Sequence, residues 1–253
     1  MTHLLVIGGN HWDERWIVSQ PLVKGESIPV KTSRQPGGAA ANMSRALKAE
    51  GYACDFASIY GFEAPPVLGS LITQVQDTPS ARYVSLEDAA GKVLNGFADM
   101  EIYEKHMTYE WYEALTKNAQ SAGSVVVDCN GPEGALAGLG PLNSIFALAV
   151  SPAKVRRLVP ILDKLRILFC NSSEAQVLGA DLKKVSFAVV TRGSKGAAIY
   201  EKGRETASYE APDWNPDSAN GLGDRLSGLV LSRVLKGQTL DQALSSALRA
   251  LPC

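Results

Sequence analysis

Cysteine and histidine are scarce in this sequence of 253 residues, which has four cysteines and three histidines. The cysteines are isolated, since no Cys-x-x-Cys pair occurs, and the histidines do not accompany them in a ligand pattern. The composition therefore argues against a zinc cage and against a disulfide framework.

Net charge and long apolar runs are also lacking. The formal net charge at pH 7 is -1, so no global basic field would attract nucleic acid or an anionic membrane surface. The longest apolar runs, such as 124–127 and 144–150, are far too short to span a bilayer, and the N-terminus has no basic-then-apolar signal peptide. We therefore expect a cytoplasmic protein without nucleic-acid or membrane partners, in which local groups hold any anionic ligand.

The sequence does contain a regular alternation of strand and helix patterns. Its composition, 45% hydrophobic and 20% charged, suits a compact α/β protein. An apolar run over 4–7 ends in two glycines, a pattern typical of a buried first strand that enters a turn. Further strands are predicted over 53–59, 124–129, 145–150, 166–170 and 187–191, and helices over 41–50, 109–116, 153–164, 172–178, 222–236 and 240–251. This alternation predicts a mostly parallel sheet covered by helices on both faces.

Other strand-like segments have no helices between them. Residues 18–33 are extended and interrupted by proline and glycine, and the pair 81–87 and 93–100 reads as a hairpin with a glycine-bearing turn. We interpret these strands, at about residues 14–34 and 80–100, as a small β appendage. Its exposed edges must be covered or paired.

The most informative motif is Asn220-Gly221-Leu222-Gly223-Asp224, directly before an apolar helix. Ligands of open parallel sheets bind beyond the carboxyl ends of the strands, where glycine amides and helix N-termini approach anionic groups. Here the glycines can turn amides toward a phosphoryl group, the helix dipole favours negative charge, and Asp224 can accept a hydroxyl proton. The alternative is a glycine turn with an acidic residue in the first turn of the helix.

A second glycine motif, Gly37-Gly38 followed by Asn42, opens a predicted helix of small residues. Close approach of the backbone to a ligand is possible there, and Asn42 offers both a donor and an acceptor to hydroxyl groups. Asp13 could hold a vicinal diol. The alternatives are a plain glycine loop before a helix and a solvated surface aspartate.

Two further segments follow predicted strand ends. Asn171 can cap a helix with Glu174 as its capping-box partner, or the two can order water and Mg²⁺ around phosphates. The loop that holds Thr191, Gly193 and Gly196 is either a hairpin turn or a nucleotide-facing loop. The residues alone leave both pairs of alternatives open.

In this order, the four segments resemble motifs of one family, the ribokinase-like (PfkB) carbohydrate and nucleoside kinases. They are similar to its first signature, its Asn-x-x-Glu motif, its Thr-x-Gly-x-x-Gly loop and its second signature. Segments 97–103, 108–112 and 126–130 further resemble pseudouridine-kinase-like members. The resemblance implies a single α/β domain over residues 1–253, a three-layer sandwich whose mostly parallel central sheet is flanked by helices and carries a small β lid.

The resemblance also implies an activity. The protein would be an ATP-dependent kinase that transfers the γ-phosphoryl group to a primary hydroxyl of a sugar or nucleoside, with pseudouridine-like acceptors favoured. Its cofactors would be ATP, Mg²⁺ and, as often in this family, a stimulating monovalent cation such as K⁺. Lids of this family often pair across a homodimer, so a homodimer through the lid is expected.

The resemblance assigns roles to individual residues. Asp224 would be the catalytic base, and the amides of Gly221 and Gly223 would form the anion hole. The acceptor would be held by Asp13, Gly37, Gly38, Asn42 and Asp99. The nucleotide would be held by Asn171, Glu174, Thr191, Gly193, Gly196, Asn220 and Leu222. Glu174 would also act indirectly on the metal ion.

The sequence departs from the family pattern in several places. Ser218 stands where the second signature usually begins with Asp, and Leu222 replaces the usual Ala between the two glycines. Leu148 stands where Asp is expected in the pseudouridine-kinase-like pattern, the Gly-x-Asp segment after Gly61 is missing, and the stretch after Glu174 is short. These departures motivate a second hypothesis, a degenerate homologue that binds a sugar or nucleoside without efficient ATP turnover.

A third hypothesis, a Rossmann dinucleotide enzyme, rests on Gly8-Gly9 after the first predicted strand. The segment lacks the three-glycine spacing of that motif, and no acidic residue closes the second strand as expected. The sequence therefore gives this hypothesis little support.

Overall fold

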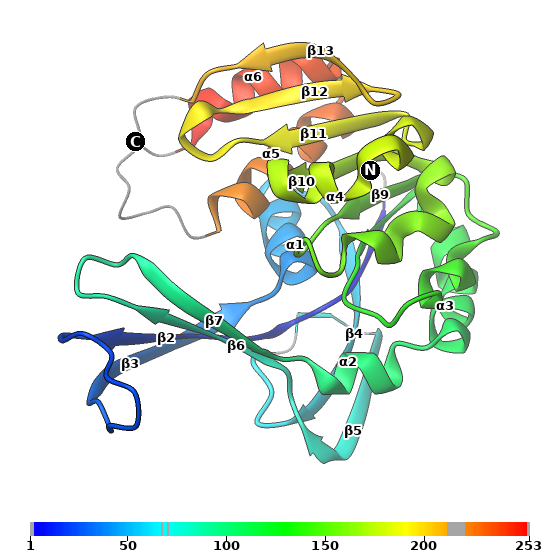
Figure 1. Ribbon diagram of the computed structural model, residues 1–253. Helices are drawn as coiled ribbons and strands as arrows, with labels where there is room; N and C mark the ends of the chain where they lie inside the picture. Colours follow the sequence, from blue (N-terminus) through cyan, green and yellow to red (C-terminus); the bar gives the residue numbers. More distant parts are fainter. Residues whose placement is uncertain (1–2, 67, 70, 212–220, 252–253) are drawn as a thin grey trace.

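The computed structural model describes residues 3–66, 68–69, 71–211 and 221–251 (Figure 1). A nine-stranded sheet, with strand order β13-β12-β11-β10-β9-β8-β1-β4-β5, forms its centre. The strands are β1 (Leu4–Ile7), β4 (Cys54–Phe62), β5 (Leu71–Pro79), β8 (Ser124–Asp128), β9 (Ile145–Leu148), β10 (Leu165–Asn171), β11 (Phe187–Thr191), β12 (Ala197–Glu201) and β13 (Arg204–Tyr209). All neighbours from β11 to β5 pair in parallel, and only β12 and β13 add in antiparallel fashion. The predicted mostly parallel sheet is confirmed.

Helices cover both faces of this sheet, so the core has three layers (Figure 1). One face is covered by α1 (Ala39–Ala49), α5 (Leu222–Leu235) and α6 (Leu240–Ala250). The other face is covered by α2 (Glu101–His106), α3 (Tyr109–Ser121), α4 (Ser172–Leu178) and the 3₁₀ helices η1 (Ala135–Leu139), η2 (Val155–Lys164) and η3 (Gly179–Lys184). None of the helices in the described ranges is long and apolar enough to cross a membrane.

Burial on both faces explains why the central strands are apolar without alternation. Each residue of β1, from Leu4 to Ile7, is 1% exposed or less, and its neighbours on β8 are similarly buried. Small residues bring the covering helices close together as well. A Cβ atom at Gly228 of α5 would lie 2.4 Å from the Cβ of Ala46 on α1, so α1 and α5 pack at a glycine.

The helix predicted over 153–164 is a 3₁₀ helix, η2, and it begins at Val155. Pro160 lies inside it and has no N–H group to donate to the preceding turn. The segment still buries an apolar face that includes Leu158 and Ile161 against the sheet. The predicted helical segment is therefore confirmed, as a 3₁₀ helix that begins two residues later than expected.

A second sheet of four strands, in the order β3-β2-β6-β7, projects from the core (Figure 1). Its strands are β2 (His11–Val18), β3 (Val30–Gly37), β6 (Arg82–Glu87) and β7 (Val93–Asp99). β2 pairs with β6 in parallel, and β3 and β7 add as antiparallel edges. β2 leaves the core directly after β1 and β3 returns to α1, so this sheet is continuous with the carboxyl end of the central strand.

Candidate functional site

A cavity of about 510 Å³ lies between the second sheet and the carboxyl ends of the parallel strands. We call it the strand-end cavity. Of the residues predicted from the sequence, it is lined by Asp13, Gly38, Asn42, Asn171, Gly221 and Asp224. Two of them that are hydrogen-bonded to each other, Asn42 and Asp224, lie 182 positions apart along the chain. The fold thus gathers most of the glycine and asparagine motifs around one space.

The second sheet presents one face to the strand-end cavity. His11, Asp13 and Arg15 alternate along β2, and each points to the same face because side chains of a strand alternate with a period of two. Asp13 pairs with Gln35 on β3 and Tyr83 on β6, and both of these also line the cavity. The face of the second sheet that lines the cavity therefore carries polar side chains, Asp13 among them. We call this face the roof of the cavity.

Asp224 lies in the first turn of α5, partly buried at the floor of the cavity. Asn42 Nδ2 donates a hydrogen bond of 2.7 Å to Asp224 Oδ2. Burial raises the pKa of Asp224 above its usual value, the nearby charges of Asp13 and Asp128 add to the rise, and the hydrogen bond from Asn42 opposes it. A carboxylate with a raised pKa is a better proton acceptor, provided that it remains ionised at the working pH.

Gly221 initiates α5 with a left-handed backbone (φ 80°) that favours glycine. Among the described residues, no side chain caps this helix, so the N–H groups of its first turn can bind another partner, such as water or an anion. A Cβ atom at Gly223 would meet no atom of the described part of the chain within 4 Å. Leu222 instead points into the core and is only 9% exposed.

Gly37 and Gly38 are required by contacts within the protein. A Cβ atom at Gly37 would lie 2.1 Å from the carboxylate of Asp13, and one at Gly38 would lie 2.3 Å from the carbonyl oxygen of Gly9. Gly38 also has a positive φ of 100°. A close approach to a ligand was predicted for this motif, but the close contacts observed are with Asp13 and with Gly9 in the turn after β1. Gly38 itself lines the cavity.

Asp128 at the end of β8 anchors the turn that leads into the second sheet. Its side chain is fully buried and accepts three hydrogen bonds of 2.9 Å, from Gly9 N, Asn130 N and Asn130 Nδ2. Sequence reasoning assigned no role to this carboxylate. Its position directly after a run of buried valines, at a predicted strand end, was the signal that could have identified it.

Lys154 brings a positive charge to the cavity and was also missed. Its Nζ donates to Asn130 Oδ1 over 3.1 Å, and its side chain is 17% exposed. Burial, followed by the nearby charge of Arg157, lowers the pKa of Lys154. Arg157 itself is held by Glu104 at 2.8 Å and by the carbonyl oxygen of Gly131 at 2.8 Å. No motif spacing pointed to Lys154, which follows a strand end by six residues.

Asn171 and Glu174 form a capping box, one of the two alternatives predicted for them. Asn171 N donates to Glu174 Oε2 over 2.7 Å, and Glu174 N donates to Asn171 Oδ1 over 3.0 Å. Glu174 is 3% exposed, and burial raises its pKa. Within the described parts of the chain, no three His, Cys, Asp or Glu side chains group closely enough to hold a metal ion. The metal role of Glu174 remains a prediction.

The loop with Thr191, Gly193 and Gly196 connects β11 to β12 through the short 3₁₀ helix η4 (Gly193–Lys195). Thr191 pairs in register with Asn171, so the loop lies at the same edge of the sheet. Gly196 has a φ of 91°, and a Cβ atom there would lie 1.9 Å from the carbonyl oxygen of Tyr209. The structure therefore shows a hairpin connection beside the strand-end cavity, outside its lining.

Asp99, predicted to hold the acceptor, lies away from the cavity. Asp99 is on the edge strand β7, where Ala98 faces the cavity and Asp99 therefore points to the other face. The Asp99 carboxylate instead forms an ion pair with Arg82, whose Nε lies 3.6 Å from Asp99 Oδ2. Asn220 and Ser218 lie outside the described residues.

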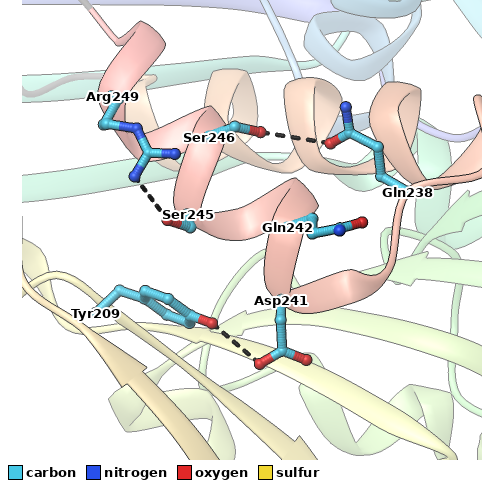
Figure 2. Close-up of a pocket in the computed structure, with 7 residues that line it drawn as sticks. All are labelled: Tyr209, Gln238, Asp241, Gln242, Ser245, Ser246 and Arg249. Carbon is cyan, nitrogen blue, oxygen red and sulfur yellow. Dashed lines mark hydrogen bonds between the residues drawn. The ribbon is translucent and has the colours of Figure 1, made fainter.

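A separate hollow of about 550 Å³ lies along α6 and the end of β13 (Figure 2). Its polar side chains largely bond to one another: Tyr209 donates to Asp241 over 3.0 Å, and Arg249 donates to Ser245 over 2.8 Å. Its described lining residues all differ from those of the strand-end cavity. It adds nothing to the site assembled from the sequence motifs.

Comparisons with known proteins bear on the fold. No family model and no curated protein matches the sequence. A carbohydrate kinase from Agrobacterium tumefaciens matches with a TM-score of 0.79 and 24% identity, over 99% of this chain and 89% of that one. A ribokinase from Cryptococcus neoformans in complex with ADP matches with a TM-score of 0.74 and 20% identity, over 99% and 92% of the two chains.

The ribokinase of Arabidopsis thaliana, complexed with ribose and ATP, gives a TM-score of 0.75 at 17% identity, over 98% of this chain and 91% of that chain. These matches cover the second sheet as well as the core, because they span nearly the whole chain. The TM-scores establish the architecture, whereas identities this low do not establish the chemistry of the site. The chain has the ribokinase fold.

Proposed function

We propose that this protein is an ATP-dependent kinase that transfers the γ-phosphoryl group to a primary hydroxyl of a sugar or nucleoside. The observation that carries the proposal is the position of Asp224, at the N-terminus of α5 and 2.7 Å from Asn42, in a cavity roofed by the second sheet. The ribokinase fold supports it, since two of the matched ribokinases were solved with ADP or with ribose and ATP.

The acceptor side of the reaction needs hydrogen-bonding groups and a base. Asp13 and Asn42 line the cavity and would hold acceptor hydroxyls, because both carry oxygen acceptors and Asn42 also carries a donor. Asp224 would take the proton of the attacking hydroxyl. The acceptor oxygen then bonds to the γ-phosphorus, the bond from that phosphorus to the bridging oxygen breaks, and ADP leaves.

The nucleotide side needs charge stabilisation more than covalent chemistry. The uncapped amides at Gly221 and Gly223, together with the helix dipole of α5, would face the transferred phosphoryl group. Lys154, which lines the same cavity as Gly221, would add a positive charge. The nucleotide would extend toward Asn171 and the β11–β12 loop, which follow at the same edge of the sheet.

Metal ions would complete the site. Mg²⁺ typically keeps several waters and binds one or two carboxylates plus substrate phosphates, so it needs no cluster of protein ligands. Glu174, at the start of α4, would act on it through water. The ion would neutralise charge on the transferred phosphoryl group. Stimulation by K⁺ is a further prediction, tested by replacing K⁺ with a bulky organic cation in the assay.

The proposal favours a nucleoside acceptor, pseudouridine-like, over a free sugar. Tyr83, Ala98 and Met100 also line the cavity and form an apolar wall beside its polar groups. A planar base can stack on such a wall, whereas a free pentose presents mainly hydroxyl groups. This wall and the sequence resemblance point to the same class of acceptor.

An assay of ADP formation against a panel of nucleosides and sugars tests the function. We expect ADP to form only when an acceptor is present, with pseudouridine and other nucleosides giving higher kcat/KM than ribose or fructose. A thermal-shift series with ATP-Mg²⁺ and the same panel runs in parallel, because a ligand stabilises the state that it binds. If a nucleoside stabilised the protein while ATP did not, and no ADP formed, the proposal would be contradicted. The protein would then be a degenerate, ligand-binding homologue.

We also propose that the protein is a homodimer that pairs through the outer face of the second sheet. This face carries the exposed aromatic side chains Trp16 and Phe97, which are 37% and 52% exposed and flank Val84 and Leu86 in the strand register. The strands β3 and β7 at its margins are sheet edges. Exposed aromatic groups beside open edges are typical of a surface that binds another chain.

Light scattering at micromolar concentration tests the dimer. The wild-type protein is expected at twice the chain mass of 27.0 kDa, and Phe97→Glu is expected to give the single-chain mass because it places a charge in the apolar interface. Phe187→Glu is the matched control, since Phe187 is 37% exposed on β11 of the central sheet. A wild-type monomer, or equal loss of the dimer in both variants, would contradict pairing through this face.

A further inference from the structure

Arg45 contacts Asn42 within the same helix, α1, and lies outside the lining of the strand-end cavity. Arg45 Nη1 donates to Asn42 Oδ1 over 2.5 Å, while Asn42 Nδ2 donates to Asp224 Oδ2 over 2.7 Å. Arg45 is therefore linked to Asp224 through a single amide group. It faces a second cavity of about 470 Å³ between α1 and α5, which Asp13 and Asn42 also line.

The guanidinium of Arg45 is held on its other side as well. Arg45 Nη2 lies 3.4 Å from Asn10 Oδ1, and Asn10 Nδ2 donates to the hydroxyl of Tyr60 over 2.5 Å. Asn10 is 1% exposed. Arg45 is thus tied both to the buried turn after β1 and to Asn42, which limits the movement of its guanidinium.

The chemistry of these groups fixes the orientation of the Asn42 amide. An asparagine amide has an accepting oxygen and a donating NH₂ group, whereas arginine can only donate. Because Arg45 takes the oxygen, the NH₂ group must face Asp224. An ionised carboxylate accepts such a bond, but a protonated carboxyl group would be better served by the amide oxygen.

We propose that Arg45 is a positioning residue, which holds the Asn42 amide with its NH₂ group toward Asp224 and so keeps that carboxylate in the ionised form. The description of Asp224 as a base rests on the proposed kinase function, but the hydrogen-bonded chain does not. Removal of Arg45 frees the Asn42 amide to rotate. The amide oxygen can then accept a hydrogen bond from the protonated carboxyl group of Asp224.

Several other charged groups face Asp224, and all but one act in the opposite direction to Arg45. Carboxylates near it disfavour its ionisation, while cations favour it. The carboxylates are Asp13 on β2, Asp128 on β8 and Glu174 on α4. The cations are Arg45 on α1 and, when protonated, His11 on β2. With three acids against it, the ionised form of Asp224 depends strongly on the hydrogen bond from Asn42.

NMR titration of the Asn42 side-chain amide tests the inference without any need for turnover. The amide signal, identified by its loss in Asn42→Ser, is followed against pH in the wild-type protein, Arg45→Met and Arg45→Lys. We expect its titration midpoint to move to higher pH in Arg45→Met, which has no donor, and to stay near the wild-type value in Arg45→Lys. Lys48→Met is the matched control, because it removes a cation from α1 whose Nζ bonds to the carbonyl oxygen of Leu68 instead.

The pH dependence of kcat/KM supplies the second readout. In Arg45→Met the acid limb should move to higher pH in step with the NMR midpoint, and the rate below that limb should fall about tenfold, the loss expected for one hydrogen bond to a charged group. The KM for ATP should not change. An unchanged NMR midpoint in Arg45→Met overturns the inference. A shifted midpoint in Arg45→Met, combined with a wild-type protein that forms no ADP with any acceptor, supports the inference and refutes the kinase function.

Discussion

Replacing Asp224 with Asn is expected to lower kcat by about 10²- to 10⁴-fold, the usual contribution of a general base. The amide has nearly the shape of the carboxylate but cannot accept the hydroxyl proton at neutral pH. Its oxygen can still accept the hydrogen bond from Asn42 Nδ2, which is 2.7 Å long in the wild-type protein. The fold and the affinity for the acceptor should therefore be retained. Rates of ADP formation, the thermal midpoint and calorimetric titration with the acceptor measure these three properties.

Asp241→Asn is the matched control for this variant. Asp241 also lies in the first turn of a C-terminal helix, α6, but its carboxylate accepts a bond from Tyr209 outside the strand-end cavity. We expect its kcat to equal that of the wild-type protein. If Asp224→Asn retained the wild-type kcat, Asp224 would not be the base, and the proposed mechanism would fail at its first step.

Replacing Asp128 with Ala should cause the largest loss of stability among the substitutions considered. Three buried N–H groups, on Gly9 and Asn130, would lose their acceptor. Each unsatisfied buried donor costs about 1–3 kcal/mol, so the free energy of unfolding should fall by about 3 kcal/mol or more. For a chain of this size, that corresponds to a fall of roughly 6–12 °C in Tm. Urea denaturation and thermal melting measure both quantities.

Asp163→Ala provides the comparison for Asp128→Ala. Asp163 is exposed on η2, and substitutions at such surface positions usually change stability by less than about 0.5 kcal/mol. Equal stabilities for the two variants would mean that the buried network around Asp128 does not hold the turn after β1. Because that turn leads into β2 and Asp13, Asp128→Ala should also raise the KM for the acceptor.

The central strands could be predicted because burial on both faces leaves an unbroken apolar run, as in β1 and β8. The edge strands gave no such signal. β5 (Leu71–Pro79) is half exposed and rich in Thr, Gln and Asp, and β13 (Arg204–Tyr209) is mostly exposed. Neither was predicted, because an edge strand with one solvated side carries a weak hydrophobic pattern. The short helix α2 was missed for a similar reason, since six residues are too few to show a period.

The site could be predicted in part. Asp13, Asn42 and Asp224 lie in motifs whose glycines mark turns at strand ends, and the fold brings all three to one cavity. The contact of Gly37 with Asp13 could not be predicted, because a glycine motif indicates that another group comes close to the backbone but does not identify that group. The direction in which Asp99 points depends on strand register, which the sequence pattern of β7 did not fix.

Lys154 and Arg45 show a second limit of sequence reasoning. Each acts through a neighbour that is distant in the chain or hidden within a helix, Asn130 for Lys154 and Asn42 for Arg45. A lone basic residue in a helix or loop is most often a solvated surface group. Only the fold distinguishes them from the other basic residues, because it places Lys154 in the lining of the strand-end cavity and Arg45 against the amide of Asn42.

Transfer of label from [γ-³²P]ATP to an acceptor, by the wild-type protein and by Asp224→Asn side by side, tests the central claim most directly. The account predicts that the wild-type protein places the label on the primary hydroxyl of a nucleoside or sugar, and that Asp224→Asn, still folded and still binding the acceptor, leaves it on ATP. The absence of labelled product with every acceptor of the panel, or equal labelling by the two proteins, would contradict it.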